Sequence, residues 1–389
     1  MRQHFLILGR NPLLSCWEAI RAFNLTPGRF YYNPQYLLAD FADGWQAQEA
    51  IARLGGTIKI GRIIKKINKA DLRKELINLA VDLLQKKRRP IFGLSCYEKG
   101  QISKKEVERL GLSIKKELKN KKISSRLVIS SQTTLSSVVV TKNKLLKKGA
   151  ELVLLFKDSE ILIGQTEVVQ DFEDYSRRDY GRPSRDSHSG MLPPKLAKIM
   201  INLAQIEKGR LLLDPFCGSG TILQEAALLG YRQLVGSDLS AKAVTDTKNN
   251  LAWLAEKSEV NFQSKVIKAD CCRVFDQIKN IGGVVTEPYL GPVNINPGKL
   301  AEISSQISDL YLSFLTAAAG KLSSQTPLVM VWPVWRIKGK KQNLDILDQI
   351  KKLGFEPISL KIGEQSRSSV IYQIPNQRVV RQIFVFVKK

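Results

Sequence analysis

Predicted strands and helices alternate strictly through the second half of the chain, from Pro194 onward. Short apolar runs mark the strands, and apolar residues at helical spacing mark the helices between them. Strands that alternate with helices form a mostly parallel sheet with helices on both faces. The last two apolar runs flank residues 375–377 and predict a β-hairpin. Residues 191–389 are therefore expected to form a doubly wound α/β domain of the Rossmann-like kind, seven-stranded, with a C-terminal hairpin.

A glycine-rich segment, DPFCGSGT at 214–221, directly follows the first strand of this domain. Gly218 and Gly220 would let the backbone approach a ligand closely at the edge of the sheet. A dinucleotide site needs a third small residue where Leu223 stands, and Asp214 would repel a pyrophosphate. No Gly-Lys-Ser/Thr follows, which excludes a P-loop. The segment instead favours a ligand with a positive charge, such as the ammonium group of a methionine moiety.

Two further acidic residues end the next two predicted strands. Asp238 is placed to accept both hydroxyls of a ribose, and Asp270 to accept the amino group of an adenine. Each acid alone would fit a helix cap or a turn. Three acids at successive strand ends, together with the glycines, predict a site for S-adenosylmethionine. The expected cofactor contacts are Asp214, Pro215, Phe216, Gly218, Gly220, Thr221, Asp238, Leu239, Asp270 and Cys271.

Positive charge is concentrated in the first part of the chain. The whole chain has 61 Lys and Arg against 36 Asp and Glu, and residues 1–150 hold 30 of the basic and 11 of the acidic residues. A basic part joined to a nearly balanced part indicates that one binds a polyanion and the other does chemistry. General solubility and a membrane-surface patch are the alternatives, and runs of lysine are often only solvated helix faces. The predicted RNA contacts are Arg88, Arg89, Arg126, Lys142 and Lys144.

Metal and membrane sites are not expected. The five cysteines have no regular spacing and the chain has only two histidines, which argues against a zinc site. The N-terminus lacks the pattern of a signal peptide, and no stretch reaches the ~18 apolar residues of a membrane helix. These features predict a soluble cytoplasmic protein that binds neither metal nor membrane.

Several segments resemble the RNA guanine N2-methyltransferases that carry an N-terminal THUMP domain, above all the tRNA (guanine-10-N2)-methyltransferases. They are the cofactor loop at 214–221, ILGRNP at 7–12, residues 165–186 and PPKLA at 193–197. The resemblance covers nearly the whole chain and is most specific in the cofactor loop. It implies a ferredoxin-like domain at 1–67, a THUMP RNA-binding domain at 68–169, a linker at 170–190 and a class I methyltransferase domain at 191–389.

The resemblance also implies a reaction, namely transfer of a methyl group from S-adenosylmethionine to the exocyclic N2 of guanosine at position 10 of tRNA. The THUMP domain would hold the acceptor end of the tRNA, and the enzyme would act with or without a small activator subunit. Methylation of ribosomal RNA or DNA amino groups is one alternative. A non-catalytic RNA-binding protein that keeps the cofactor fold is another.

The candidate catalytic residues follow the fourth strand, where the family has an acid or amide, two prolines and an aromatic residue. This chain has Thr286, Glu287, Pro288 and Tyr289 there. Glu287 is predicted to supply the missing carboxylate from one position along, and Tyr289 to stack on the base. The alternative is a core tyrosine in an inactive site. Trp335 and the neighbouring arginine either border the base pocket or are a packed Trp beside a solvated Arg.

Overall fold

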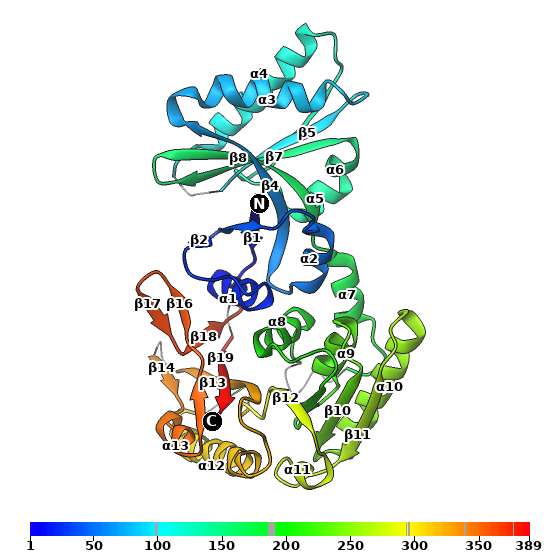
Figure 1. Ribbon diagram of the computed structural model, residues 1–389, viewed down its shortest axis with the longest axis vertical. Coiled ribbons are helices and arrows are strands. Elements are labelled where there is room, and N and C mark those ends of the chain that lie inside the picture. The colour runs from blue at the N-terminus through cyan, green and yellow to red at the C-terminus, as the bar shows by residue number, and fades with distance from the viewer. Residues whose placement is uncertain (98–99, 186–190, 293, 295, 338–339, 376) are drawn as a thin grey trace. The chain divides into compact units, whose positions relative to one another are not determined.

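The computed structural model describes residues 1–389 except 98–99, 186–190, 293, 295, 338–339 and 376 (Figure 1). Parts of two predicted features, the linker at 170–190 and the turn at 375–377, lie outside the described residues. The chain divides into two compact units. The N-terminal unit comprises residues 1–12, 28–53 and 57–172, and the C-terminal unit comprises residues 13–27, 54–56 and 173–389.

The N-terminal unit contains one eight-stranded sheet in the order β2-β3-β1-β4-β8-β7-β5-β6. β5 runs parallel to β6 and β7, and the other neighbours are antiparallel. The sequence predicts two domains, at 1–67 and 68–169, and strands from both segments join this sheet because β4 pairs with β8. The strands are β1 Arg2–Leu8, β2 Phe30–Asn33, β3 Tyr36–Phe41, β4 Thr57–Asn68, β5 Ile91–Tyr97, β6 Arg126–Val128, β7 Gly149–Lys157 and β8 Glu160–Val169.

Two long helices cover part of this sheet. α4 begins with a capping box, in which the Ser103 hydroxyl accepts from the Glu106 N–H and the Glu106 carboxylate accepts from the Ser103 N–H. The apolar faces of α3 and α4 share one buried cluster with Phe92 and Leu152 of the sheet. The helices are α2 Ala47–Arg53, α3 Leu72–Leu84, α4 Lys104–Asn120, α5 Ser137–Lys142 and α6 Leu145–Lys148, with a 3-10 turn at Lys69–Asp71.

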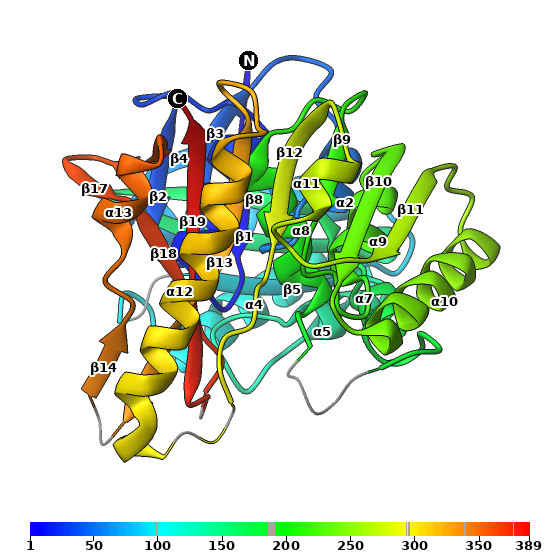
Figure 2. The same cartoon turned by 90° about the horizontal axis from the view of Figure 1, so that it is seen from below.

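The C-terminal unit contains the sheet β11-β10-β9-β12-β13-β19-β15 (Figure 2). Its first five strands are parallel, and β19 is antiparallel to both of its neighbours. β18 pairs with β19 and β14 with β13. The Rossmann-like fold and its C-terminal hairpin are thus confirmed. The strands are β9 Leu211–Asp214, β10 Gln233–Asp238, β11 Gln263–Lys268, β12 Ile281–Thr286, β13 Pro327–Ile337, β14 Lys340–Asn343, β15 Phe355–Pro357, β18 Ser369–Tyr372 and β19 Val379–Lys388. A separate pair is β16 Leu360–Ile362 with β17 Gln365–Arg367.

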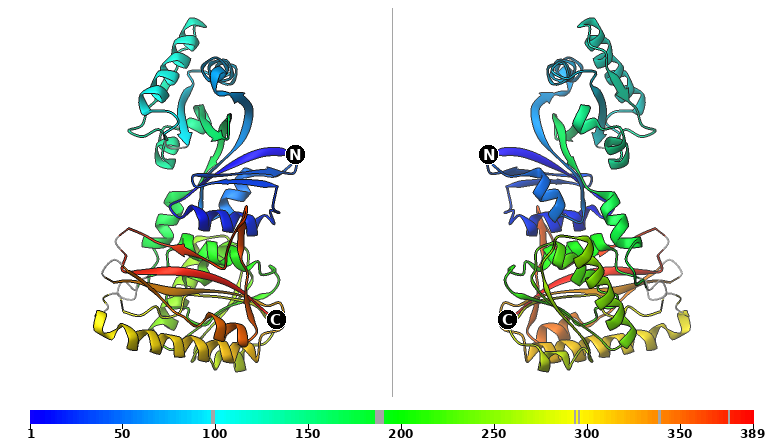
Figure 3. Two further views of the ribbon diagram at one scale, coloured as in Figure 1. Left: turned by 90° about the vertical axis from the view of Figure 1, so that its left-hand side faces the viewer. Right: turned by 90° about the vertical axis from the view of Figure 1, so that its right-hand side faces the viewer.

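Helices pack against this sheet through two hydrophobic clusters. One cluster includes side chains of α1, α8, α9 and α10, and the other includes side chains of α11, α12 and α13. Figure 3 shows the long α12, in yellow, running along the sheet. α7 lies within the segment predicted as a linker, so part of that segment is helical. The helices are α1 Pro12–Ala22, α7 Phe172–Tyr180, α8 Pro194–Ala204, α9 Thr221–Leu228, α10 Ala241–Lys257, α11 Val274–Gln277, α12 Leu300–Ala319 and α13 Leu347–Lys352.

Within the described part of the chain, no helix is both long enough and apolar enough to span a bilayer.

Candidate active site

The three predicted acids lie along one edge of the C-terminal sheet. Asp214 is the last residue of β9 and Asp238 the last of β10, and Asp270 follows the end of β11 by two residues. These strands are adjacent and parallel, and β12 joins them on the other side of β9 with Thr286 as its last residue. Because the carboxyl ends of parallel strands share one edge, the fold gathers all four predicted side chains there, where doubly wound sheets bind ligands.

The glycine-rich loop between β9 and α9 is held by backbone and side-chain hydrogen bonds. The Cys217 N–H donates to the Ser237 carbonyl at 2.9 Å, and the Thr247 hydroxyl donates to the Gly218 carbonyl at 2.7 Å. Gly218 and Gly220 have φ angles of +52° and +80°, which other residues adopt at a cost. Apart from its chain neighbours, no described atom lies within 4 Å of the place where a Cβ of Gly218 would stand, so the loop is open at this position.

Asp238 has a fixed orientation beside this loop. One carboxylate oxygen accepts from the Gly218 N–H at 3.0 Å and the other from the Ser240 N–H at 2.9 Å. A carboxylate has about four lone-pair sites, so it keeps acceptor capacity for two further hydroxyls. The next residue, Leu239, is 70% exposed. An apolar side chain with that exposure beside a strand-end acid is available to contact a ligand.

Asp270 is exposed, and its Oδ1 accepts from the Cys272 N–H at 2.8 Å. Cys271 is buried, and burial raises the pKa of its thiol above the ordinary range. Burial also raises the pKa of the Cys272 thiol. A raised pKa disfavours the thiolate form, so neither thiol is activated as a nucleophile.

Asp214 is buried, unlike the other two acids. Its Oδ1 accepts from the Phe216 N–H at 3.2 Å and from the Thr286 hydroxyl at 2.8 Å. Burial raises the pKa of Asp214 to about 7, although these two hydrogen bonds act in the opposite direction. Thr286 is fully buried as well. Its hydroxyl therefore links β12 to β9 and orients Asp214.

Glu287, the predicted source of the missing carboxylate, forms an ion pair within the chain. Its two oxygens form an ion pair with Arg381 of β19, with distances of 2.5 Å to Nε and 3.0 Å to Nη2. The side chains of Glu287 and Arg381 are only 12% and 7% exposed. Burial lowers the pKa of Arg381, but the charge of Glu287, its hydrogen bond and a contribution from Tyr372 together leave the pKa raised. Sequence reasoning missed Arg381, which lies 94 residues from its partner and in no recognisable motif.

The rest of the loop after β12 is anchored through its backbone. The Tyr311 hydroxyl donates to the Tyr289 carbonyl at 3.0 Å, and Trp335 Nε1 donates to the Leu290 carbonyl at 3.2 Å. The Tyr289 side chain is 58% exposed, which contradicts the alternative of a core tyrosine. Pro288 is buried. Trp335 is fully buried, in agreement with a packed Trp rather than one bordering the base pocket.

Comparisons with known proteins agree with this geometry. The family described as RMKL-like, methyltransferase domain, matches residues 182–334. A probable tRNA (guanine(10)-N2)-dimethyltransferase of Methanothermococcus thermolithotrophicus is 30% identical over 148 residues, which cover 36% of this chain and 90% of that protein. The chain therefore belongs to the family of this relative, the tRNA (guanine(10)-N2)-dimethyltransferases.

Other members of this methyltransferase family match a smaller share of their length. The tRNA (guanine(10)-N2)-dimethyltransferase of Methanocaldococcus jannaschii is 27% identical over 206 residues, covering 49% of this chain and 57% of that protein. The chain thus matches about half the length of the first curated relatives. Among solved structures, TrmN from Thermus thermophilus has a TM-score of 0.57 at 16% identity, covering 100% of both chains. At that identity the similarity concerns the fold.

The predicted RNA contacts lie in the N-terminal unit of this family member. Arg88, Arg89 and Arg126 line one surface hollow together with Lys87, Lys147 and Lys148. No acidic residue is among its described lining residues. The predicted contacts Lys142 and Lys144 are exposed but do not line it. The hollow gathers cations from three segments, which a run of lysines on a single solvated helix would not do.

Proposed function

We propose that this chain is an S-adenosylmethionine-dependent methyltransferase that acts on the exocyclic N2 of guanosine at position 10 of tRNA. The observation that carries the proposal is the set of carboxylates gathered at adjacent strand ends beside an open glycine loop. Relatives named tRNA (guanine(10)-N2)-dimethyltransferase support the choice of atom, nucleotide and RNA. A tRNA substrate would place the protein in the cytoplasm.

The residues at the strand ends fit S-adenosylmethionine. Asp238 has acceptor capacity for the ribose hydroxyls, and exposed Asp270 can accept from the adenine amino group. Gly218 leaves open space where a side chain would otherwise obstruct a ligand. When bound, the cofactor would supply a methyl group on a sulfonium, which is electrophilic. The loop and the acids would then serve to orient it toward the end of β12.

The loop after β12 has groups suited to a guanine base. The exposed Tyr289 ring can stack on a base that has left its helix. Arg381 holds Glu287 in one orientation, and the carboxylate keeps lone pairs beyond those used in the ion pair. Glu287 and a backbone carbonyl of the loop would accept hydrogen bonds from the N2 amine. Acceptors fixed in this way stabilise the positive charge that develops on the nitrogen.

The basic hollow of the N-terminal unit fits the phosphates of an RNA. Six of its lining residues are Lys or Arg. Such clusters neutralise phosphates and release counterions, and they give affinity with little sequence preference. We assign the choice of nucleotide to the loop after β12 and the binding of RNA phosphates to this hollow.

The experiment is methyl transfer to tRNA transcripts with isotope-labelled S-adenosylmethionine, followed by mass spectrometry of the nucleosides. The expected product is N2-methylguanosine, and a transcript with adenosine at position 10 should remain unlabelled. Label in another nucleoside, or only in ribosomal RNA or DNA, would refute the assignment. The Arg381 ion pair gives one specific reason to consider a non-catalytic protein, since it engages both oxygens of the predicted acceptor. Cofactor binding without any transfer would support that alternative.

A further inference from the structure

Arg182 is a buried cation that forms no ion pair with an acidic residue in the described part of the chain, although the charges of Asp179 and Glu225 act on it from farther away. Arg182 belongs to the C-terminal unit, and the residue is 3% exposed. Nη1 donates to the Thr221 hydroxyl at 2.6 Å and Nη2 contacts the Met191 sulfur at 3.2 Å. Nε has no hydrogen-bond partner among the described residues. Burying a guanidinium without a carboxylate is costly, so this arrangement suggests that an anion is still to bind.

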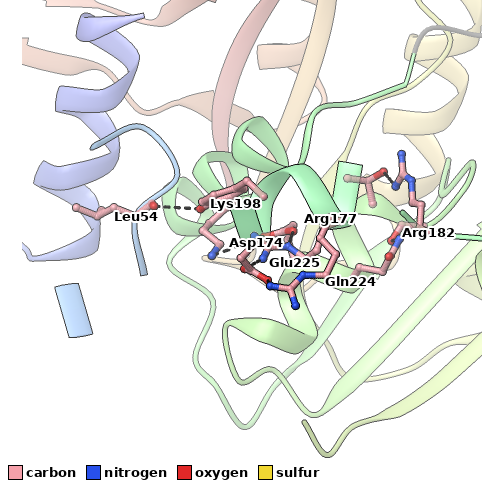
Figure 4. Close-up of polar contacts among 11 residues, drawn as sticks. Leu54, Asp174, Arg177, Arg182, Lys198, Gln224 and Glu225 are labelled. Atoms are coloured by element: carbon pink, nitrogen blue, oxygen red, sulfur yellow. Dashed lines mark hydrogen bonds and ion pairs between the residues drawn. The ribbon is translucent and has the colours of Figure 1, made fainter. Parts of the chain in front are cut away.

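A neighbouring arginine shows the contrast. Arg178, on α7, is equally buried, but it donates to Glu225 at 2.7 Å and also forms an ion pair with Asp174. Figure 4 shows Asp174, Lys198 and Glu225 grouped together, with Arg182 to one side of them. Among the described residues, Arg178 therefore has acidic partners in direct contact, whereas burial lowers the pKa of Arg182 despite the more distant charges of Asp179 and Glu225. Arg182 is left with a hydroxyl and a thioether as its described partners.

Arg182 is positioned directly beside the cofactor loop. Thr221, its hydrogen-bond partner, is the first residue of α9 and the last of the glycine-rich segment. Asn250 fixes the same two segments together, because its amide donates to the Ser184 carbonyl at 2.9 Å and to the Ser219 carbonyl at 2.8 Å. The Ser184 N–H donates back to Asn250 at 3.0 Å. Residues 182–184 are thus held against the glycine-rich loop.

We propose that Arg182 binds the carboxylate of the cofactor's methionine moiety, next to the N-terminus of α9. This inference rests on the proposed function, since it requires the loop to bind S-adenosylmethionine. The partial positive charge of a helix N-terminus favours an anion at the same place. An α-amino acid carries an ammonium and a carboxylate on one carbon. The loop has a matching pair, with acidic Asp214 where it begins and Arg182 beside Thr221 where it ends.

The test compares ligands that differ only in the amino-acid part. Calorimetry should show that Arg182→Met weakens binding of S-adenosylhomocysteine by about 10- to 100-fold, the loss expected for a charge-assisted hydrogen bond. Binding of 5′-methylthioadenosine, which lacks the amino-acid part, should not change. Arg182→Lys keeps the charge without the planar fork and should fall between the two. Arg177→Met is the matched control, because Arg177 is an exposed cation on the same segment and its side chain is 65% exposed.

If Arg182→Met lowers the affinities for S-adenosylhomocysteine and 5′-methylthioadenosine equally, Arg182 only supports the fold. Unchanged affinity for S-adenosylhomocysteine would also overturn the proposal. A second measurement uses the unmodified protein. It should bind S-adenosylmethionine at least about tenfold more tightly than decarboxylated S-adenosylmethionine. Equal affinities would refute the role of Arg182 while leaving the proposed function intact. Failure of the unmodified protein to bind any of these nucleosides would overturn the proposed function itself.

Discussion

The ion pair between Glu287 and Arg381 allows structural and catalytic roles of Glu287 to be separated. Arg381→Met removes the cation but keeps much of its apolar volume. The change leaves a carboxylate that is 12% exposed without its described partner. Breaking one side of a buried ion pair typically costs about 3–5 kcal/mol in the free energy of unfolding. Because neither group is fully buried, we expect the lower end, about 3 kcal/mol.

That loss is large enough to measure in the C-terminal unit. For a unit of this size, a loss of about 3 kcal/mol lowers Tm by roughly 6–12 °C. Adding Glu287→Gln removes the carboxylate charge that Arg381→Met leaves unpaired. The double variant Glu287→Gln/Arg381→Met should therefore recover part of the lost free energy of unfolding. Urea unfolding of the single and double variants measures the coupling. Methyl transfer measured in parallel should be lost in both variants that lack the Glu287 carboxylate.

An exposed ion pair of the same unit provides the control. Lys321 and Asp276 are 51% and 65% exposed. Lys321→Met should therefore lower the free energy of unfolding by no more than about 1 kcal/mol. If Arg381→Met destabilises the chain no more than Lys321→Met does, the buried pair does not stabilise the loop after β12. If Glu287→Gln keeps full methyl transfer, Glu287 is not the acceptor for the amine.

Three further predictions concern other parts of the protein. Burial raises the pKa of Asp214 from 3.8 to about 7, so the stability that this group contributes is present below pH 3.8 and is lost as the pH rises through about 7. Asp214→Asn should remove this pH dependence. Above pH 7, the free energy of unfolding of the variant should exceed that of the unmodified protein by up to about 4 kcal/mol, which urea unfolding at several pH values would measure. Parallel pH dependence of the unfolding free energy in both proteins would contradict the raised pKa. Asp238→Ala should abolish calorimetric binding of S-adenosylhomocysteine, and unchanged affinity would refute the cofactor site. Replacing Arg88, Arg89 and Arg126 with Gln should weaken tRNA binding and lower the salt slope by about one per charge removed; an unchanged slope would exclude the hollow as the phosphate contact.

The positions of the three acids could be predicted because they depend on local sequence. Asp214 and Asp238 end their strands and Asp270 follows the next strand by two residues, and adjacent parallel strands bring such residues to one edge. The glycine-rich loop was predictable for the same reason, since two positive φ angles require glycine within a few residues. The fold followed from the strict alternation of elements.

The partners of these residues could not be predicted, because they come from distant parts of the chain. Arg381 reaches Glu287 from β19, and Arg182 reaches Thr221 across 39 residues. The helix α7 was missed for a different reason. Its segment is rich in charged residues with little apolar content, which is typical of a linker, and the helix is instead held by buried contacts such as Arg178 with Glu225. Tertiary contacts of this kind override local composition.

The most direct test of the proposed activity is nucleoside mass spectrometry of tRNA from cells with and without this protein. The fragments that contain position 10 would be isolated and their guanosines analysed. The proposal predicts N2-methylated guanosine at that position only when the protein is present, and its return when the unmodified chain, but not the Asp238→Ala variant, is restored. Methylated guanosine at that position in cells of both kinds, or no difference in any tRNA nucleoside, would contradict it.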